Sequence, residues 1–97
     1  MIRHVSLLKW KPDTTPEQVE AITTALRGLP PQISELLDYR VGPDAGVDTG
    51  NFDFAVVGEF ESEAGYETYR DHPAHRAVAT ELILPNLAER AALQYRV

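Results

Sequence analysis

The sequence predicts an α+β fold in which a four-stranded antiparallel sheet carries its helices on one face. The hydrophobic patterns follow one another in the order strand, helix, strand, strand, helical region, strand. The chain has 97 residues, which is an ordinary size for one compact domain. We therefore expect a single domain over residues 1–97 with the ferredoxin-like split β-α-β arrangement.

Composition narrows the classes of function. The sequence has no cysteine, which excludes disulfides, thiolate metal sites and thiol nucleophiles. Fifteen acidic residues outnumber nine basic ones, and the basic residues are scattered singly, so we expect no nucleic-acid partner. No segment approaches the ~20 apolar residues that span a bilayer, and no cleavage signal follows the first apolar run. We expect a cytoplasmic protein without a membrane partner.

Residues 2–11 alternate in a way that predicts a strand with two apolar faces. His4 and Ser6 share one face with Leu8, and Val5 and Leu7 lie on the other. A helix is then expected from Pro16 to about residue 29. Its predicted start is a capping box, in which Thr15 and Gln18 would satisfy each other's backbone amides. Apolar residues follow at helical spacing, and Gly28 and two prolines end the pattern: Val19, Ile22, Leu26 and Leu29 form the stripe.

The second half of the chain repeats the alternation. We expect a strand over residues 38–42, a loop over 43–51 and a strand over 52–61. Ser62 is the predicted N-cap of a helix that ends near Asp71, because a residue before a proline avoids helical geometry. Pro73 suits the first position of a further helix over residues 73–84. Pro85 is expected to bend or restart that helix into residues 86–91, and residues 92–97 are the predicted last strand.

The two-sided strands predict a homodimer. Two helical layers cannot cover both faces of one small sheet. The face that carries Val5, Leu7, Ala55 and Val57 therefore needs a cover that so short a chain does not supply. A second copy packed sheet against sheet about a two-fold axis would supply it.

Four segments together resemble one known family. They are "IRHVSLLKWKP", "GNFDFAVVGEFES", "YETYRDHPAH" and "ERAALQYRV". In this combination the chain resembles the stress-responsive dimeric α/β-barrel (Dabb) proteins over nearly its whole length. The resemblance implies a ferredoxin-like protomer and a homodimer in which two sheets close into a barrel. Many members of that family are known only as stress-responsive.

The resemblance also implies candidate catalytic residues. The family includes the plant polyketide cyclase that forms olivetolic acid by intramolecular aldol condensation. That enzyme has a histidine early in its first strand and a tyrosine three residues before an "HPAH" motif. Carried over by position, these residues are His4, Tyr69 and His75 here. The aromatic residues of that enzyme's first helix are replaced by Ile22, Thr23 and Leu26, which disfavours a long-tailed polyketide substrate.

Physical reasoning gives His75 a specific role. In the first turn of a helix, free backbone amides and the helix dipole disfavour a charged imidazole. A neutral imidazole at physiological pH can act as a general base. Tyr69 could then supply a phenol to polarise a carbonyl group, with His4 in support.

Structural alternatives exist for each histidine. His72 could cap a helix next to Pro73. His75 could pack against the sheet with a backbone partner, and His4 could be a satisfied core residue. A metal site made by His72 and His75 is disfavoured, because a proline separates them and their spacing is not the usual i, i+4. We expect no metal.

Two hypotheses of function remain. In the first, the protein binds a small apolar carbonyl or aromatic compound and catalyses cofactor-free acid/base chemistry, as a cyclase, lyase or isomerase does. His75 would be the base and Tyr69 the donor, and the predicted apolar lining consists of Leu8, Phe54, Val56 and Leu82. In the second, the protein is a non-catalytic stress-responsive dimer or a ligand-binding module. A cavity of ligand size would favour the first.

Overall fold

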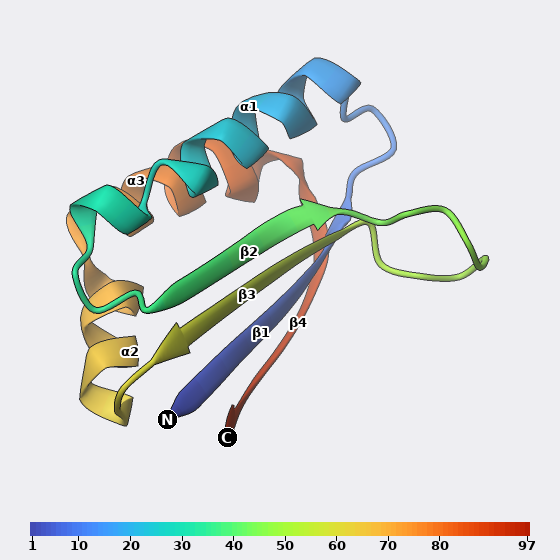
Figure 1. Ribbon diagram of the computed structural model, residues 1–97. Helices are drawn as coiled ribbons and strands as arrows, with labels where there is room; N and C mark the ends of the chain where they lie inside the picture. The colour runs from blue at the N-terminus through green and yellow to red at the C-terminus, as the bar shows by residue number, and fades with distance from the viewer.

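The computed structural model describes residues 1–97, which form a β-sheet with a layer of helices on one face (Figure 1). The strands are β1 (Ile2–Trp10), β2 (Asp38–Pro43), β3 (Phe54–Phe60) and β4 (Leu87–Arg96). The α-helices are α1 (Pro16–Arg27), α2 (Glu63–Asp71) and α3 (Pro73–Val78). Short helical turns are η1 (Pro30–Gln32), the π-helical η2 (Ala79–Ile83) and η3 (Leu84–Asn86).

The sheet has the strand order of the predicted fold. Four strands pair antiparallel in the order β2-β3-β1-β4, and the helices all lie on one side of them (Figure 1). In this register Leu8 of β1 lies between Phe54 of β3 and Arg90 of β4. The sequence prediction of a ferredoxin-like α+β protomer is therefore confirmed.

The hydrophobic core lies between the helices and one face of the sheet. β1 buries alternate residues from Ile2 to Leu8, and β3 buries alternate residues from Phe54 to Phe60. From the helical layer, Ile22 and Leu26 of α1 complete the core. His4 and Ser6 belong to the same buried row of β1, and they are the polar side chains buried with it. The buried face of the sheet is therefore the one that the alternation of residues along the strands predicted to face the helices.

The predicted helix starts are formed by the predicted caps. Thr15 and Gln18 make the reciprocal hydrogen bonds of a capping box, and Pro16 is the first residue of α1. Ser62 accepts a hydrogen bond from the Gly65 amide at the start of α2. These local signals depend on few neighbours, which is why the sequence alone indicates them.

The region after Pro73 differs from the prediction. The expected helix over residues 73–84 is α3 followed by a π-helical turn and a 3₁₀ turn. The expected helix over residues 86–91 is wrong, because β4 already begins at Leu87. The Asn86 carbonyl accepts a hydrogen bond from the Lys11 amide (2.8 Å), and Leu87 then pairs with Trp10. Pairing with β1 overrides the helical preference of the alanines, glutamate and arginine that follow.

The other face of the sheet has no cover within the chain. Val5 lies between Val57 and Leu93 in the register, and these side chains form an apolar row. Leu93 is 57% exposed and Tyr95 is 42% exposed, although both are large. No helix approaches this side in Figure 1.

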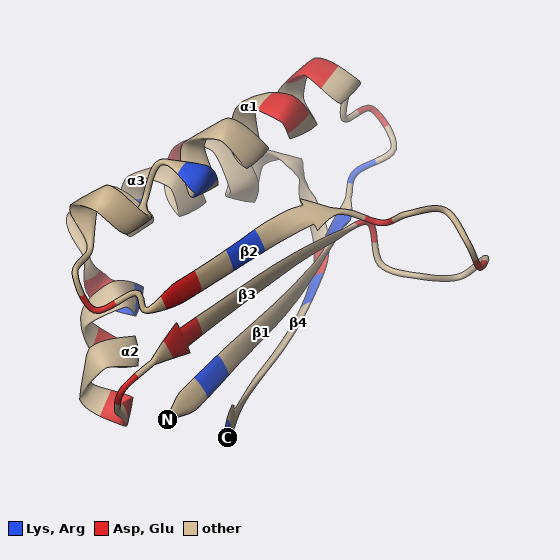
Figure 2. Cartoon of the chain, viewed as in Figure 1, with Lys and Arg blue, Asp and Glu red and all other residues tan.

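Charged residues are dispersed over the elements. Figure 2 shows basic positions spaced along the strands and helices among acidic ones, in keeping with the net charge of −6. None of the helices has the length and apolar character that crossing a membrane requires.

Candidate functional site

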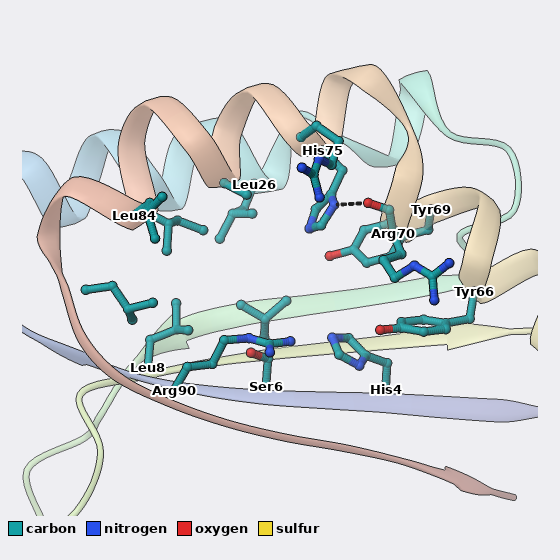
Figure 3. A pocket seen from close by; sticks show the side chains of 15 residues that line it. His4, Ser6, Leu8, Leu26, Tyr66, Tyr69, Arg70, His75, Leu84 and Arg90 are labelled. Atoms are coloured by element: carbon teal, nitrogen blue, oxygen red, sulfur yellow. Dashed lines mark hydrogen bonds between the residues drawn. The ribbon is translucent and has the colours of Figure 1, made fainter.

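A cavity of about 390 Å³ opens between the sheet and the helical segment after Tyr69. This volume lies in the range of small-molecule sites. Its floor comes from β1, β3 and β4, and its roof comes from α1, α2, α3 and the turns that follow (Figure 3). Fifteen residues line it, nine of them hydrophobic: His4, Ser6, Leu8, Leu26, Val56, Tyr66, Tyr69, Arg70, His75, Arg76, Ala79, Ile83, Leu84, Leu87 and Arg90. The three residues predicted as catalytic, His4, Tyr69 and His75, are all among them.

His75 is held at the roof of the cavity by a backbone partner. Its Nδ1 lies 2.9 Å from the Arg70 carbonyl oxygen, drawn as a dashed line in Figure 3. A carbonyl can only accept a hydrogen bond, so Nδ1 carries the proton, and in the neutral ring Nε2 keeps a free lone pair. Burial lowers the pKa of His75, the bond to Arg70 opposes this, and the charges of Arg76 and Arg90 add to it. The ring is a neutral base at physiological pH.

The pKa of His75 is lowered, which is the predicted direction, but the main cause is burial and not the helix dipole. α3 has only six residues, so its dipole is short. The partner carbonyl belongs to α2 rather than to the sheet.

His4 has the opposite tautomer. The side-chain amide of Gln94 on β4 lies 2.8 Å from His4 Nδ1, and an amide NH₂ can only donate. His4 Nδ1 is therefore the acceptor, and Nε2 carries the hydrogen. The ring is 4% exposed, and its centroid lies 4.8 Å from that of Tyr66. Burial, with smaller contributions from the charges of Arg90 and His75, lowers the pKa of His4 to about 4. His4 is a neutral N–H donor rather than a base.

Tyr69 connects the two histidines. Its ring centroid lies 4.3 Å from that of His75 and 6.2 Å from that of His4. Tyr69 is 2% exposed, and its hydroxyl lies 2.8 Å from the hydroxyl of Tyr39 on β2. Burial raises the pKa of Tyr69 far above its ordinary value and that of Tyr39 to about 12. Both phenols stay protonated, and the hydrogen bond between them fixes the position of the Tyr69 hydroxyl beside the cavity.

His72 lies outside this cavity. Its backbone forms both the end of α2 and the start of α3, and its Nδ1 accepts a hydrogen bond from the Ala74 amide (3.0 Å). The predicted capping role of His72 is confirmed. No group of three or more histidine and carboxylate side chains lies close enough together to hold a metal ion.

Two of the four predicted apolar lining residues face the cavity. Leu8 and Val56 line it, and Phe54 and Leu82 do not. Phe54 packs against Trp10 instead, with ring centroids 5.7 Å apart. From the π-helical turn, Ala79 and Ile83 line the cavity, and Leu82 lies beside Ile22 of α1 instead. That Leu8 and Val56 contact a ligand remains a prediction.

Two lining residues, Tyr66 and Arg90, and the hydrogen-bond partner of Tyr69, Tyr39, were not found from the sequence. Tyr66 lies one helical turn before Tyr69 on α2, so helical spacing could have indicated it. Arg90 pairs with Leu8 and shares its face. Strand parity could have placed Arg90 beside the histidines, but the helix expected over residues 86–91 concealed it. Tyr39 belongs to a strand whose alternation is short, and only the fold brings its hydroxyl to Tyr69.

Comparison with solved structures places the fold among dimeric proteins. The chain is 47% identical to a dimeric ferredoxin-like protein of unknown function from Thermobifida fusca, with a TM-score of 0.92, over 99% of this chain and 90% of that one. A Dabb family protein from Mesorhizobium loti is 19% identical, with a TM-score of 0.82, over 99% and 95% of the two chains. Hydroxynitrile lyase from Passiflora edulis is 22% identical, with a TM-score of 0.86, over 99% and 92%. The last two likenesses concern the fold alone.

No curated protein matches the sequence. The family model of the Stress responsive A/B Barrel Domain, Dabb, matches residues 2–97. That match covers nearly the whole chain and agrees with the strand order, the helical layer and the Thermobifida fusca structure. The chain belongs to the Dabb family of stress-responsive α/β-barrel domains.

Proposed function

We propose that the cavity binds a small apolar carbonyl compound and that His75 and Tyr69 catalyse proton transfer at the carbon next to its carbonyl group. The observation that carries this proposal is the pair of opposite tautomers. His75 offers a bare Nε2 to the cavity, because Arg70 holds its Nδ1 hydrogen, and His4 offers an N–H. One base and two donors thus line the same apolar space.

The proposed chemistry balances without a further reactant. Nε2 of His75 removes a proton from the carbon, and the C–H electron pair moves toward the carbonyl, whose oxygen becomes negative. The Tyr69 hydroxyl and the N–H of His4 donate hydrogen bonds to that oxygen. The enolate then takes a proton back, or attacks a second carbonyl of the same molecule in an aldol closure. Acid/base chemistry of this kind uses no cofactor.

The burial of the site supports the assigned roles. Both phenols and both histidines are neutral near pH 7, so the site starts without a charge on any of them. Charge that develops on the substrate oxygen in a partly water-excluded cavity interacts strongly with these fixed donors. The rings of Tyr69 and His75 lie against each other, with centroids 4.3 Å apart, and keep base and donor on the same side of the cavity.

We also infer that the protein is a homodimer through the uncovered sheet face. Val5, Val57 and Leu93 form an apolar row there without a cover in the chain. The Thermobifida fusca relative is described as dimeric. A second copy packed sheet against sheet would bury this apolar row between the two sheets.

The test of the catalytic proposal is hydrogen–deuterium exchange at the methylene next to the ketone of an aryl ketone, followed by NMR in D₂O. The probes are β-benzoylpropanoate and its neutral carboxamide. We expect wild type to accelerate exchange of at least one probe, and His75→Ala to lose about 100-fold or more of that acceleration. His72→Ala is the matched control, because His72 belongs to the same motif but not to the cavity lining, and it should retain the rate.

Other outcomes separate the alternatives. Exchange that is unchanged in His75→Ala, together with a large fall in melting temperature, would show that His75 is structural. Binding of a probe detected by thermal shift, without any exchange, would instead favour the non-catalytic ligand-binding dimer.

A further inference from the structure

The lining of the cavity has a charge opposite to that of the protein. The chain has a net charge of −6, yet the fifteen lining residues include three arginines and no aspartate or glutamate. An apolar carbonyl compound alone gives no reason for this charge.

The three arginines are not equivalent. Arg70 forms two hydrogen bonds to the carboxylate of Asp71, each 2.9 Å long, so its charge is balanced locally. The side chains of Arg76 and Arg90 take part in no salt bridge and no side-chain hydrogen bond. Two cations at the cavity are therefore without a partner.

Arg90 is the cation best placed to meet a ligand. It pairs with Leu8 in the register of β4, which puts its side chain on the helix-facing side of the sheet. Figure 3 shows its guanidinium group extending across the cavity floor toward Ser6 and His4. Its charge acts on His4, Tyr69 and His75 alike, in agreement with that central position.

We propose that Arg90, with Arg76 at the rim, binds a carboxylate of the substrate, so that the carbonyl compound is a keto acid rather than a neutral ketone. This inference rests on the proposed function of the same cavity. A guanidinium group and a carboxylate fit each other as a planar pair with two parallel hydrogen bonds. The hydrophobic remainder of the lining then holds the apolar part of the acid, and the carbonyl group lies toward Tyr69 and His75.

A carboxylate fits the site better than a phosphate does. The guanidinium group of Arg90 at the cavity floor can form the planar pair with two parallel hydrogen bonds that suits a carboxylate. The usual sites of a phosphoryl group add backbone amides from a helix start or a glycine-rich loop. The cavity contains no such loop, because its lining has no glycine.

The experiment compares β-benzoylpropanoate with its carboxamide by calorimetry and by the exchange assay, in wild type, Arg90→Gln, Arg90→Lys and Arg96→Gln. Arg96 lies further along the same face of β4, outside this cavity, and is the matched control. We expect wild type to bind the acid ~10-fold or more tightly than the amide. Arg90→Gln should abolish that ratio, Arg90→Lys should keep part of it, and Arg96→Gln should leave it unchanged.

The readout is the ratio of the two affinities, for the acid and for the amide. Any general damage to a variant affects both probes equally and leaves this ratio unchanged. Equal affinity for both probes in wild type would overturn the carboxylate assignment, while His75-dependent exchange of both would leave the proposed function intact. A ratio that persists in Arg90→Gln would also overturn it. Tighter binding of phenacyl phosphate than of β-benzoylpropanoate would replace the carboxylate by a phosphoryl group. If neither ketone binds or exchanges, this inference and the proposed function fail together.

Discussion

At the scale of single residues, the site depends on which atom of each ring carries the hydrogen. Arg70 and Gln94 are not expected to touch the reacting atoms, yet each fixes the tautomer of one histidine. The sequence indicates His4, Tyr69 and His75 through a motif, but it contains no signal for these partners. Arg70 lies at the end of α2, and Gln94 lies on β4, 90 residues from His4 in the chain. Tautomers are therefore the part of the site that only the fold supplies.

Tyr39 is expected to position Tyr69. The hydroxyl of Tyr39 is 2.8 Å from that of Tyr69, and this hydrogen bond holds the Tyr69 phenol where it can meet the substrate oxygen. Tyr39→Phe should therefore lower the exchange rate about 10-fold, which corresponds to the loss of one hydrogen bond of ~1.4 kcal/mol in the transition state. Tyr95→Phe, on the other face of the sheet, should not change the rate. An unaltered rate in Tyr39→Phe would mean that Tyr69 needs no such partner.

His4 is expected to make folding sensitive to acid. Its pKa is about 4 in the folded protein and 6.5 when unperturbed, so between these values the unfolded chain binds a proton that the folded chain does not. The stability of the neutral, buried ring is complete above pH 6.5 and is lost as the pH falls toward 4. The loss attributable to His4 should reach about 3 kcal/mol, since one pKa unit is ~1.4 kcal/mol.

The check is urea unfolding of wild type and His4→Gln at several pH values. Other groups titrate in the same range, so the informative quantity is the difference between the two proteins. That difference should shrink as the pH falls from 6.5 to 4. A constant difference would show that His4 titrates normally in the folded protein.

At the scale of elements, local signals were sufficient where one or two residues decide the structure. The capping box at Thr15, the N-cap Ser62 and the break at Pro73 are of this kind. The strand over residues 87–91 was missed, because its residues are good helix formers and only pairing with β1 makes them extended. That error also concealed Arg90, whose role depends on strand parity. Arg90 was missed because the start of β4 was missed.

The junction between α2 and α3 is expected to depend on one histidine cap. His72 accepts a hydrogen bond from the Ala74 amide, and Pro73 has no amide hydrogen of its own, so this cap serves a helix of only six residues. His72→Ala should lower the free energy of unfolding by about 1 kcal/mol, and His72→Asn should restore most of it. Urea unfolding measures both. Equal stability of the three proteins would show that the cap contributes nothing.

At the scale of the whole molecule, the two faces of the sheet have separate roles. The helix-facing side of β1 holds His4, Ser6 and Leu8 at the cavity, and the other side presents Val5 and Leu7. One protomer supplies every residue of the proposed site. The sequence predicted this division from strand parity, because alternation assigns residues to faces whatever the topology. What parity could not predict is the charge of the cavity, which arises from three elements brought together.

Dimerisation is therefore expected to be separable from the site. Leu93 is 57% exposed in the protomer and lies beside Val5 in the apolar row. In the proposed dimer, Leu93→Glu would bury an unpaired carboxylate in each protomer, at a cost of several kcal/mol, and should raise the dimer dissociation constant by about 100-fold or more. Val47→Glu is the control, because Val47 is an equally apolar side chain that is 83% exposed in a loop away from the sheet.

Sedimentation velocity over a range of protein concentrations measures the shift from dimer to monomer in Leu93→Glu, with Val47→Glu sedimenting like wild type. The monomeric variant should still bind β-benzoylpropanoate, since no lining residue lies on the interface side of the sheet. A Leu93→Glu protein that remains dimeric would place the interface elsewhere. A monomer that folds but no longer binds the acid would show that the second copy shapes the cavity, and that the two faces are coupled through β1 and β4.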